Sequence, residues 1–219
     1  MTRLNQIELA VAAAMLAVSP WVIYAAPHEA TMGLVYKIFF YHFPSAWLYL
    51  IGAIVAGVCS AIFLFGGNRN MDSWALAAAE MTVLFGAMTL VTGPLWARKA
   101  WGVWWVWDAR LTSSLMVWMV FVAYLILRRF GGPGSDKLGA GMALFGLASV
   151  PFIFVSVNVW RTLHPQTSVI PTLPVSMGRP LWFCFTAMFL LFLALLSLRA
   201  RLERQRMRIE ELYLAEDEA

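Results

Sequence analysis

Charged residues are scarce in this chain of 219 residues, of which 13% are charged and 61% are hydrophobic. A soluble domain is typically about 25% charged and about 45–50% apolar. The composition therefore excludes an ordinary water-soluble globular protein and indicates an integral membrane protein in a lipid bilayer. The formal net charge of +4 is modest and gathers where the apolar segments end, so nucleic acid is not an expected partner.

Cysteine is also nearly absent. The two cysteines, Cys59 and Cys184, lie inside apolar segments, and each is expected to be a buried structural thiol. The chain contains no Cys-x-x-Cys and no Cys-x-x-Cys-His. These absences exclude a thiol relay and covalent attachment of c-type haem to this chain.

The abundant feature is long apolar sequence, which predicts an all-α integral membrane protein with six transmembrane helices in a single domain, 1–219. A span needs about 20 apolar residues to cross a hydrocarbon core of about 30 Å. The first window resembles a signal-peptide core but lacks a convincing cleavage site, so it is expected to remain as a helix. The short fourth window is expected to be longer than written and to include part of residues 101–112 or the end at Arg129. Gly93-Pro94 predicts a break in the chain after the third window. The windows are 7–25, 43–65, 74–93, 113–127, 138–158 and 181–198.

An even number of spans places both termini on one side of the membrane. Ten of the 16 lysines and arginines would lie on that side and six on the other. The positive-inside rule then predicts that both termini are cytoplasmic. Half of the ten lie in the segment 199–219, which is basic and then acidic and is expected to continue the last helix into the cytoplasm.

One connection between spans is unusually rich in tryptophan. The segment 101–112 reads Trp-Gly-Val-Trp-Trp-Val-Trp-Asp-Ala-Arg-Leu-Thr and should lie at the outer, periplasmic surface. It could be an amphipathic helix that only anchors the protein, or a flat aromatic shelf for a planar ligand. If it is helical, Trp107 points elsewhere while four side chains share one face: Trp101, Trp104, Trp105 and Asp108.

Two of the three histidines flank this Trp-rich segment in the predicted topology. His42 begins the second span in Tyr-His-Phe-Pro-Ser-Ala-Trp, and His164 follows the fifth span. A single interfacial histidine usually has a structural role. Two histidines beside an aromatic shelf leave a structural role and a role as ligands equally open. His28 lies in a polar loop beside Glu29 and is expected to be exposed.

The same outward loops carry the residue types that haem binding requires. Zinc needs three or four clustered ligands, which these loops do not offer. Haem needs one or two axial ligands, an apolar or aromatic wall, and cations for its propionates. The cations available for that role are Arg98, Lys99, Arg110 and Arg161. This inventory favours haem over zinc.

Glu80 is the one acidic residue that lies more than one turn inside a predicted span, since Glu8 is only the second residue of the first window. A carboxylate within a membrane is a candidate for function. Because Glu80 lies near the predicted cytoplasmic end of its span, an interfacial role remains open beside a role in transport.

The motifs around these residues resemble the CcmC family, which handles haem in bacterial cytochrome c maturation within the tryptophan-rich WWD superfamily. The segment 104–112 has the Asp-Ala-Arg form of that family, whereas related synthases usually continue Trp-Asp-Pro. Segments 41–47 and 162–164 resemble its two histidine-bearing segments. With the six-span layout, the resemblance covers essentially the whole chain.

The resemblance implies a protein of the bacterial inner membrane that is not an enzyme. It would hold haem b non-covalently on the periplasmic face and help to load it onto the haem chaperone CcmE, together with CcmA, CcmB and CcmD. Carried over by motif, His42 and His164 would be the axial ligands of the haem iron. The platform for haem and the chaperone would consist of Trp101, Trp104, Trp105, Trp107, Asp108 and Arg110.

Three other classes of function compete with this interpretation. A transporter could move haem through its own helix bundle past Glu80, although few polar residues lie within the spans. A cytochrome b-like electron carrier would need histidines inside paired spans, and no predicted span contains one. A scaffold would bind protein partners without binding haem.

Overall fold

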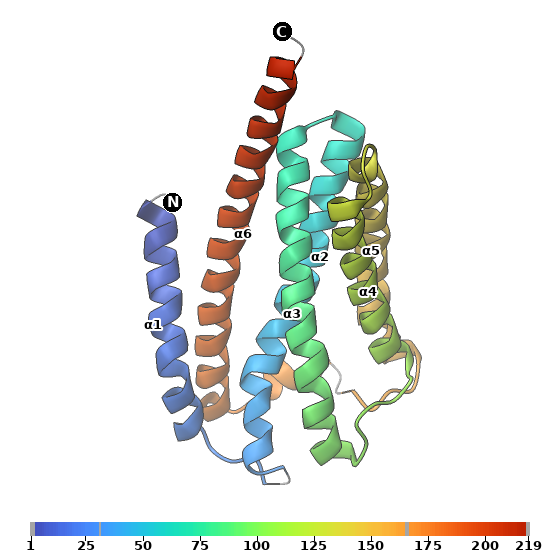
Figure 1. Ribbon diagram of the computed structural model, residues 1–219. Coiled ribbons are helices and arrows are strands. Elements are labelled where there is room, and N and C mark those ends of the chain that lie inside the picture. Colours follow the sequence, from blue (N-terminus) through green and yellow to red (C-terminus); the bar gives the residue numbers. More distant parts are fainter. Residues whose placement is uncertain (1–2, 31, 165–166, 218–219) are drawn as a thin grey trace.

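The computed structural model of the protein describes residues 3–30, 32–164 and 167–217. Within these residues it is helical, with no β-strand, and six helices are long and apolar enough to cross a membrane (Figure 1). The all-α prediction with six spans is confirmed. The elements in chain order are α1 (Arg3–Ala25), η1 (Leu34–Ile38), α2 (Phe39–Gly66), α3 (Arg69–Trp101), α4 (Ala109–Phe130), α5 (Ser135–Val159), η2 (Thr167–Thr172) and α6 (Val175–Asp217).

The central helix of the bundle is α2, which packs against α3, α5 and α6. Helix α1 packs against α6 at one side, and α4 packs against α5 at the other (Figure 1). Large side chains such as Phe85, Phe121 and Phe192 are almost fully buried between the helices. The start of α1 and the end of α6 lie at the same end of the bundle, which we call the terminal end (Figure 1). We call the opposite end of the bundle the loop end.

The predicted break at Gly93-Pro94 is wrong. Pro94 lies inside α3, and the helix continues for two further turns to Trp101. Proline removes only its own backbone hydrogen bond, and a membrane helix can tolerate that loss where neighbouring groups compensate. The prediction that the fourth span extends beyond 127 was correct, since α4 runs from Ala109 to Phe130.

The Trp-rich segment is not a continuous helix. Gly102, with a φ of 76°, adopts the left-handed conformation that ends α3. Asp108 is extended and caps the start of α4, accepting the Leu111 backbone N–H at 2.7 Å. Residues 102–108 therefore form a connection between helices, and the expected helical face does not exist. That face would have comprised Trp101, Trp104, Trp105 and Asp108.

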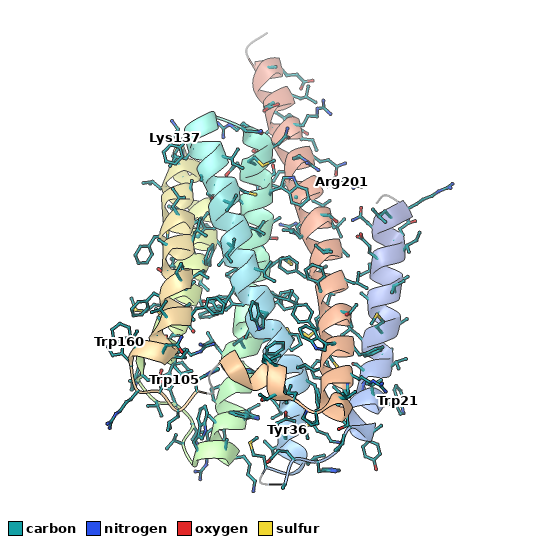
Figure 2. All side chains as sticks on the ribbon, turned by 180° about the vertical axis from the view of Figure 1, so that it is seen from behind. Trp21, Tyr36, Trp105, Lys137, Trp160 and Arg201 are labelled. Atoms are coloured by element: carbon teal, nitrogen blue, oxygen red, sulfur yellow. The ribbon has the colours of Figure 1, made fainter. Side chains whose placement is uncertain are left out.

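The two ends of the bundle carry different side chains. Figure 2 shows Lys137 and Arg201 toward the terminal end, and Trp21, Tyr36 and Trp105 toward the loop end. Helix α6 continues without interruption through 199–217 and projects beyond the other helices (Figure 1).

Candidate functional site

The loop end contains a cavity of about 220 Å³ between α2, α3, the Trp-rich connection, the start of α4 and the end of α5. Both predicted ligands line it: His42 from the first turn of α2, and His164 from the segment that follows α5. Residues that are more than 120 positions apart in sequence (164 − 42 = 122) thus meet at one site. The two histidines that the sequence singled out therefore line one cavity.

Aromatic side chains form much of the cavity wall. Trp96 and Trp101 lie one and a half turns apart on α3, and their ring centroids are 5.3 Å apart in an edge-on arrangement. Sequence reasoning overlooked Trp96 because it lies outside the segment 101–112, although its nearness in sequence to that segment was a usable signal. The aromatic lining residues are Tyr36, Phe39, Phe43, Trp47, Tyr49, Trp96, Trp101, Trp104, Trp105 and Phe154.

Trp107 does not line the cavity. Its side chain is 75% exposed, and its ring meets that of Trp105 edge-on at 5.8 Å. Trp105 does line the cavity, and Trp104, which is 57% exposed, lies both on the wall and at the surface. The Trp-rich connection therefore has one side toward the cavity and one toward the surroundings.

Asp108 is buried but also does not line the cavity. One carboxylate oxygen accepts the Leu111 N–H at the start of α4, and the other accepts the hydroxyl of Thr162. The same Thr162 oxygen accepts the backbone N–H of His164 at 3.0 Å. Asp108 thus connects the Trp-rich connection to the loop that carries His164. The sequence suggested that Asp108 organises its loop, but Thr162 was not foreseen.

His42 is held from α3. Its Nδ1 lies 2.9 Å from the hydroxyl oxygen of Thr92, which is not among the lining residues. The short helix η1 ends at Ile38 and α2 begins at Phe39, so His42 lies in the first turn of α2. Its position on a packed helix contrasts with the loop position of His164.

Arg110 is the only predicted propionate-binding cation that lines the cavity. Arg98 lies 6.0 Å from the centroid of the Trp104 ring and donates to the carbonyl of Gly102. Lys99 and Arg161 are exposed. Among the described residues, then, Arg110 alone of the four candidates is positioned to meet a carboxylate inside the cavity.

Three buried donors on the cavity wall have no hydrogen-bond partner within the described part of the chain. They are Nη1 of Arg110 and the indole nitrogens of Trp96 and Trp105. Buried polar groups in folded proteins are almost always hydrogen-bonded. One guanidinium nitrogen and two indole N–H groups without partners in an apolar cavity suit a ligand that is largely apolar and carries anionic acceptors.

The side chains at this site fit haem. Two imidazoles from separate elements can supply axial ligands, aromatic rings can contact the macrocycle, and Arg110 can meet a carboxylate. A zinc site has less support, because the described residues contain no group of three or more His, Cys, Asp or Glu side chains placed to hold a metal ion.

The remaining candidates lie elsewhere. His28 is exposed, as expected. Glu80 does not line the cavity, and it accepts two hydrogen bonds of 2.5 Å from Arg199, which join α3 to α6. The structure thus provides Glu80 with a packing role at the terminal end.

Comparison with known proteins identifies the sequences to which this chain is similar. The family model described as Heme exporter protein C matches residues 1–215. A heme exporter protein C of Bradyrhizobium diazoefficiens is 34% identical over 195 residues, covering 86% of this chain and 74% of that protein. That of Escherichia coli K12 is 31% identical over 207 residues, covering 89% and 82% respectively. A mitochondrial ccmC-like protein of cytochrome c biosynthesis from Marchantia polymorpha is 34% identical over 172 residues, covering 77% and 74%.

Proposed function

The chain belongs to the heme exporter protein C (CcmC) family, and we propose from this premise that it binds haem b non-covalently and presents it to the chaperone CcmE. Family membership supports a role in haem handling for cytochrome c biogenesis. The observation that carries the proposal is the meeting of His42, His164 and Arg110 around one aromatic cavity. No step requires this chain to act as an enzyme.

Haem supplies an iron that accepts imidazole ligands, a flat apolar ring and two carboxylates. In the proposed complex, His42 and His164 would hold the haem iron through imidazole nitrogens, and Arg110 would neutralise a propionate. Trp96 and Trp105 offer their indole N–H groups as further donors. Asp108 acts indirectly, because through Thr162 it positions the backbone of His164.

The exposed tryptophans support a docking surface for the chaperone. Trp107 is largely exposed, and it touches Trp105, which lines the cavity. We assign Trp107 to the chaperone side of the platform and Trp101 to the haem side. A chaperone docked there would reach the outward edge of the ligand, where the imidazole N–H of its own histidine could add across the double bond of a vinyl group. Neither His42 nor His164 would then be the covalent acceptor.

The proposed location is the inner membrane of a bacterium, with the cavity on the periplasmic side. The start of α1 and the end of α6 lie at the terminal end of the bundle (Figure 1), whereas the cavity is lined by residues of the loop end. The bias of lysine and arginine toward the terminal end supports a cytoplasmic position for the termini. CcmA, CcmB and CcmD are the proposed partners within the membrane complex, as the family resemblance implies.

The test is an absorption spectrum of detergent-purified protein supplied with haem, with His42→Ala and His164→Ala as variants. We expect each variant to lose the spectrum of the bis-histidine complex and to load CcmE poorly. His28→Ala is the matched control, because His28 is exposed and outside the cavity. Unchanged spectra and full chaperone loading in both cavity variants would overturn the axial-ligand assignment. A wild-type protein with no Soret band would favour a scaffold.

A further inference from the structure

Thr92 holds a position beside the cavity that the proposed haem site does not itself explain. It lies on α3 outside the lining, yet its hydroxyl oxygen is 2.9 Å from Nδ1 of His42. Either atom of this pair could in principle be the donor, and the choice decides which imidazole nitrogen carries a hydrogen. The surroundings of Thr92 settle that choice.

The hydroxyl of Thr92 is also 2.6 Å from the backbone carbonyl oxygen of Met88, one turn earlier on α3. Two oxygens at this distance need a hydrogen between them, because this is the range of O–H···O bonds. A carbonyl has no hydrogen to give, so the hydrogen comes from Thr92. A threonine hydroxyl has one hydrogen, and at His42 it can therefore only accept.

It follows that Nδ1 of His42 carries the hydrogen and donates it to Thr92. In a neutral imidazole the other nitrogen, Nε2, then has a free lone pair. Gly93 adds a packing constraint: a Cβ at that position would lie 3.3 Å from Cε1 and 3.9 Å from Nδ1 of His42. The Nδ1–Cε1 edge of the ring thus faces α3, and the hydrogen-bonded nitrogen is the one held at the helix.

We propose that Thr92 is a positioning residue that fixes His42 in the tautomer whose Nε2 can bind haem iron. This proposal rests on the proposed function for its ligand, although the tautomer is a property of the protein alone. Metal-binding histidines commonly donate their second N–H to a carbonyl, carboxylate or water, and loss of such a partner typically costs about 10–100-fold in metal affinity. Here the partner is a threonine hydroxyl aligned by its own helix.

The first measurement is nitrogen NMR of haem-free protein with labelled histidine. The chain has three histidines, so the His42 signals are identified by their loss in His42→Ala. We expect the Nδ1–H tautomer in the wild type and in Thr92→Ser, which keeps the hydroxyl. In Thr92→Val, which has nearly the same shape without an acceptor, we expect the Nε2–H form or a mixture. A wild-type Nε2–H tautomer, or no change in Thr92→Val, would overturn the proposal.

The second measurement is haem affinity and the haem spectrum of the same variants. We expect Thr92→Val to weaken haem binding by roughly 10–100-fold and to reduce the six-coordinate spectrum, with recovery in Thr92→Ser. Thr186→Val is the matched control, since Thr186 makes the same type of bond to a carbonyl four residues earlier, at 2.9 Å, on an exposed face of α6. Thr186→Val should leave affinity and spectrum unchanged, and an equal loss in that control would overturn the positioning role.

Adding Thr92→Val to His42→Ala separates action through His42 from a direct effect on the cavity. If Thr92 acts only through the imidazole, the second substitution has no further effect on haem affinity. A further loss of the same size as in the wild-type background would contradict the proposal. If the wild type has the Nδ1–H tautomer but binds no haem, the proposed function alone is overturned. If haem binds and its affinity does not change in Thr92→Val, this inference alone is overturned.

Discussion

The terminal end and the loop end of the bundle use their few polar groups in opposite ways. At the terminal end, charged side chains join neighbouring helices, as in the pairs Asp72–Arg128 and Glu80–Arg199. At the loop end, Arg110 keeps a buried N–H beside the cavity without a partner among the described residues. The comparison teaches that charged side chains are paired where they join helices, whereas one buried cation is left available where a ligand is proposed.

The strongest way to test this contrast is to break the buried pair at the terminal end. Asp72 is 2% exposed, and Arg128 donates to both of its carboxylate oxygens. Asp72→Leu leaves the Arg128 charge buried without its partner, which should lower the free energy of unfolding by about 3–5 kcal/mol. Denaturant unfolding in detergent measures this change.

Haem affinity provides the internal control for Asp72→Leu. Because Asp72 is outside the cavity, the folded fraction of the variant should bind haem with wild-type affinity. The double variant Asp72→Leu/Arg128→Leu should recover part of the stability, since no charge remains buried. A specific loss of haem affinity in the folded fraction would show that the two ends are not independent.

A smaller effect is expected at the loop end, on binding rather than on stability. Arg110→Gln removes the cation proposed to meet a propionate, and a hydrogen bond to a charged group contributes about 1.5–3 kcal/mol. Haem affinity, measured by titration of the Soret band, should therefore fall by roughly 10–100-fold. Unfolding should change little, because Nη1 has no protein partner in the described residues.

Arg161→Gln is the matched control for Arg110, since Arg161 is an exposed cation outside the cavity. It should leave haem affinity close to that of the wild type. An equal loss in both variants would point to general charge attraction and would remove the special role of Arg110.

The smallest effect is expected from Glu80→Gln. Its ion pair is partly exposed, with Glu80 at 26% and Arg199 at 39%, so the loss of stability should be at most about 1 kcal/mol. Delivery of haem to CcmE, measured by covalent haem on the chaperone, should be unchanged. A large loss of delivery with normal stability would instead favour the transporter that moves haem past Glu80.

Predictions from local sequence succeeded where the physical cause is local. The spans follow from hydropathy, and the α4 extension follows from length, because the window 113–127 is shorter than the roughly 20 residues that a span needs. The break at Pro94 was wrong because proline removes a single backbone bond, while the surrounding apolar residues still favour a helix. The helical alternative for the Trp-rich segment is not realised, because Gly102 ends α3 and Asp108 caps the start of α4.

The sequence by itself determined that this protein is a six-span membrane protein, and it identified two histidines and an aromatic segment as candidates for haem binding. Those features depend on composition and on short motifs. Only the tertiary structure decided that Thr92 contacts His42, 50 residues away, and that Asp108 contacts Thr162, 54 residues away. Such contacts depend on which faces of separate helices meet and on where each helix ends, so no pattern within one segment could reveal them.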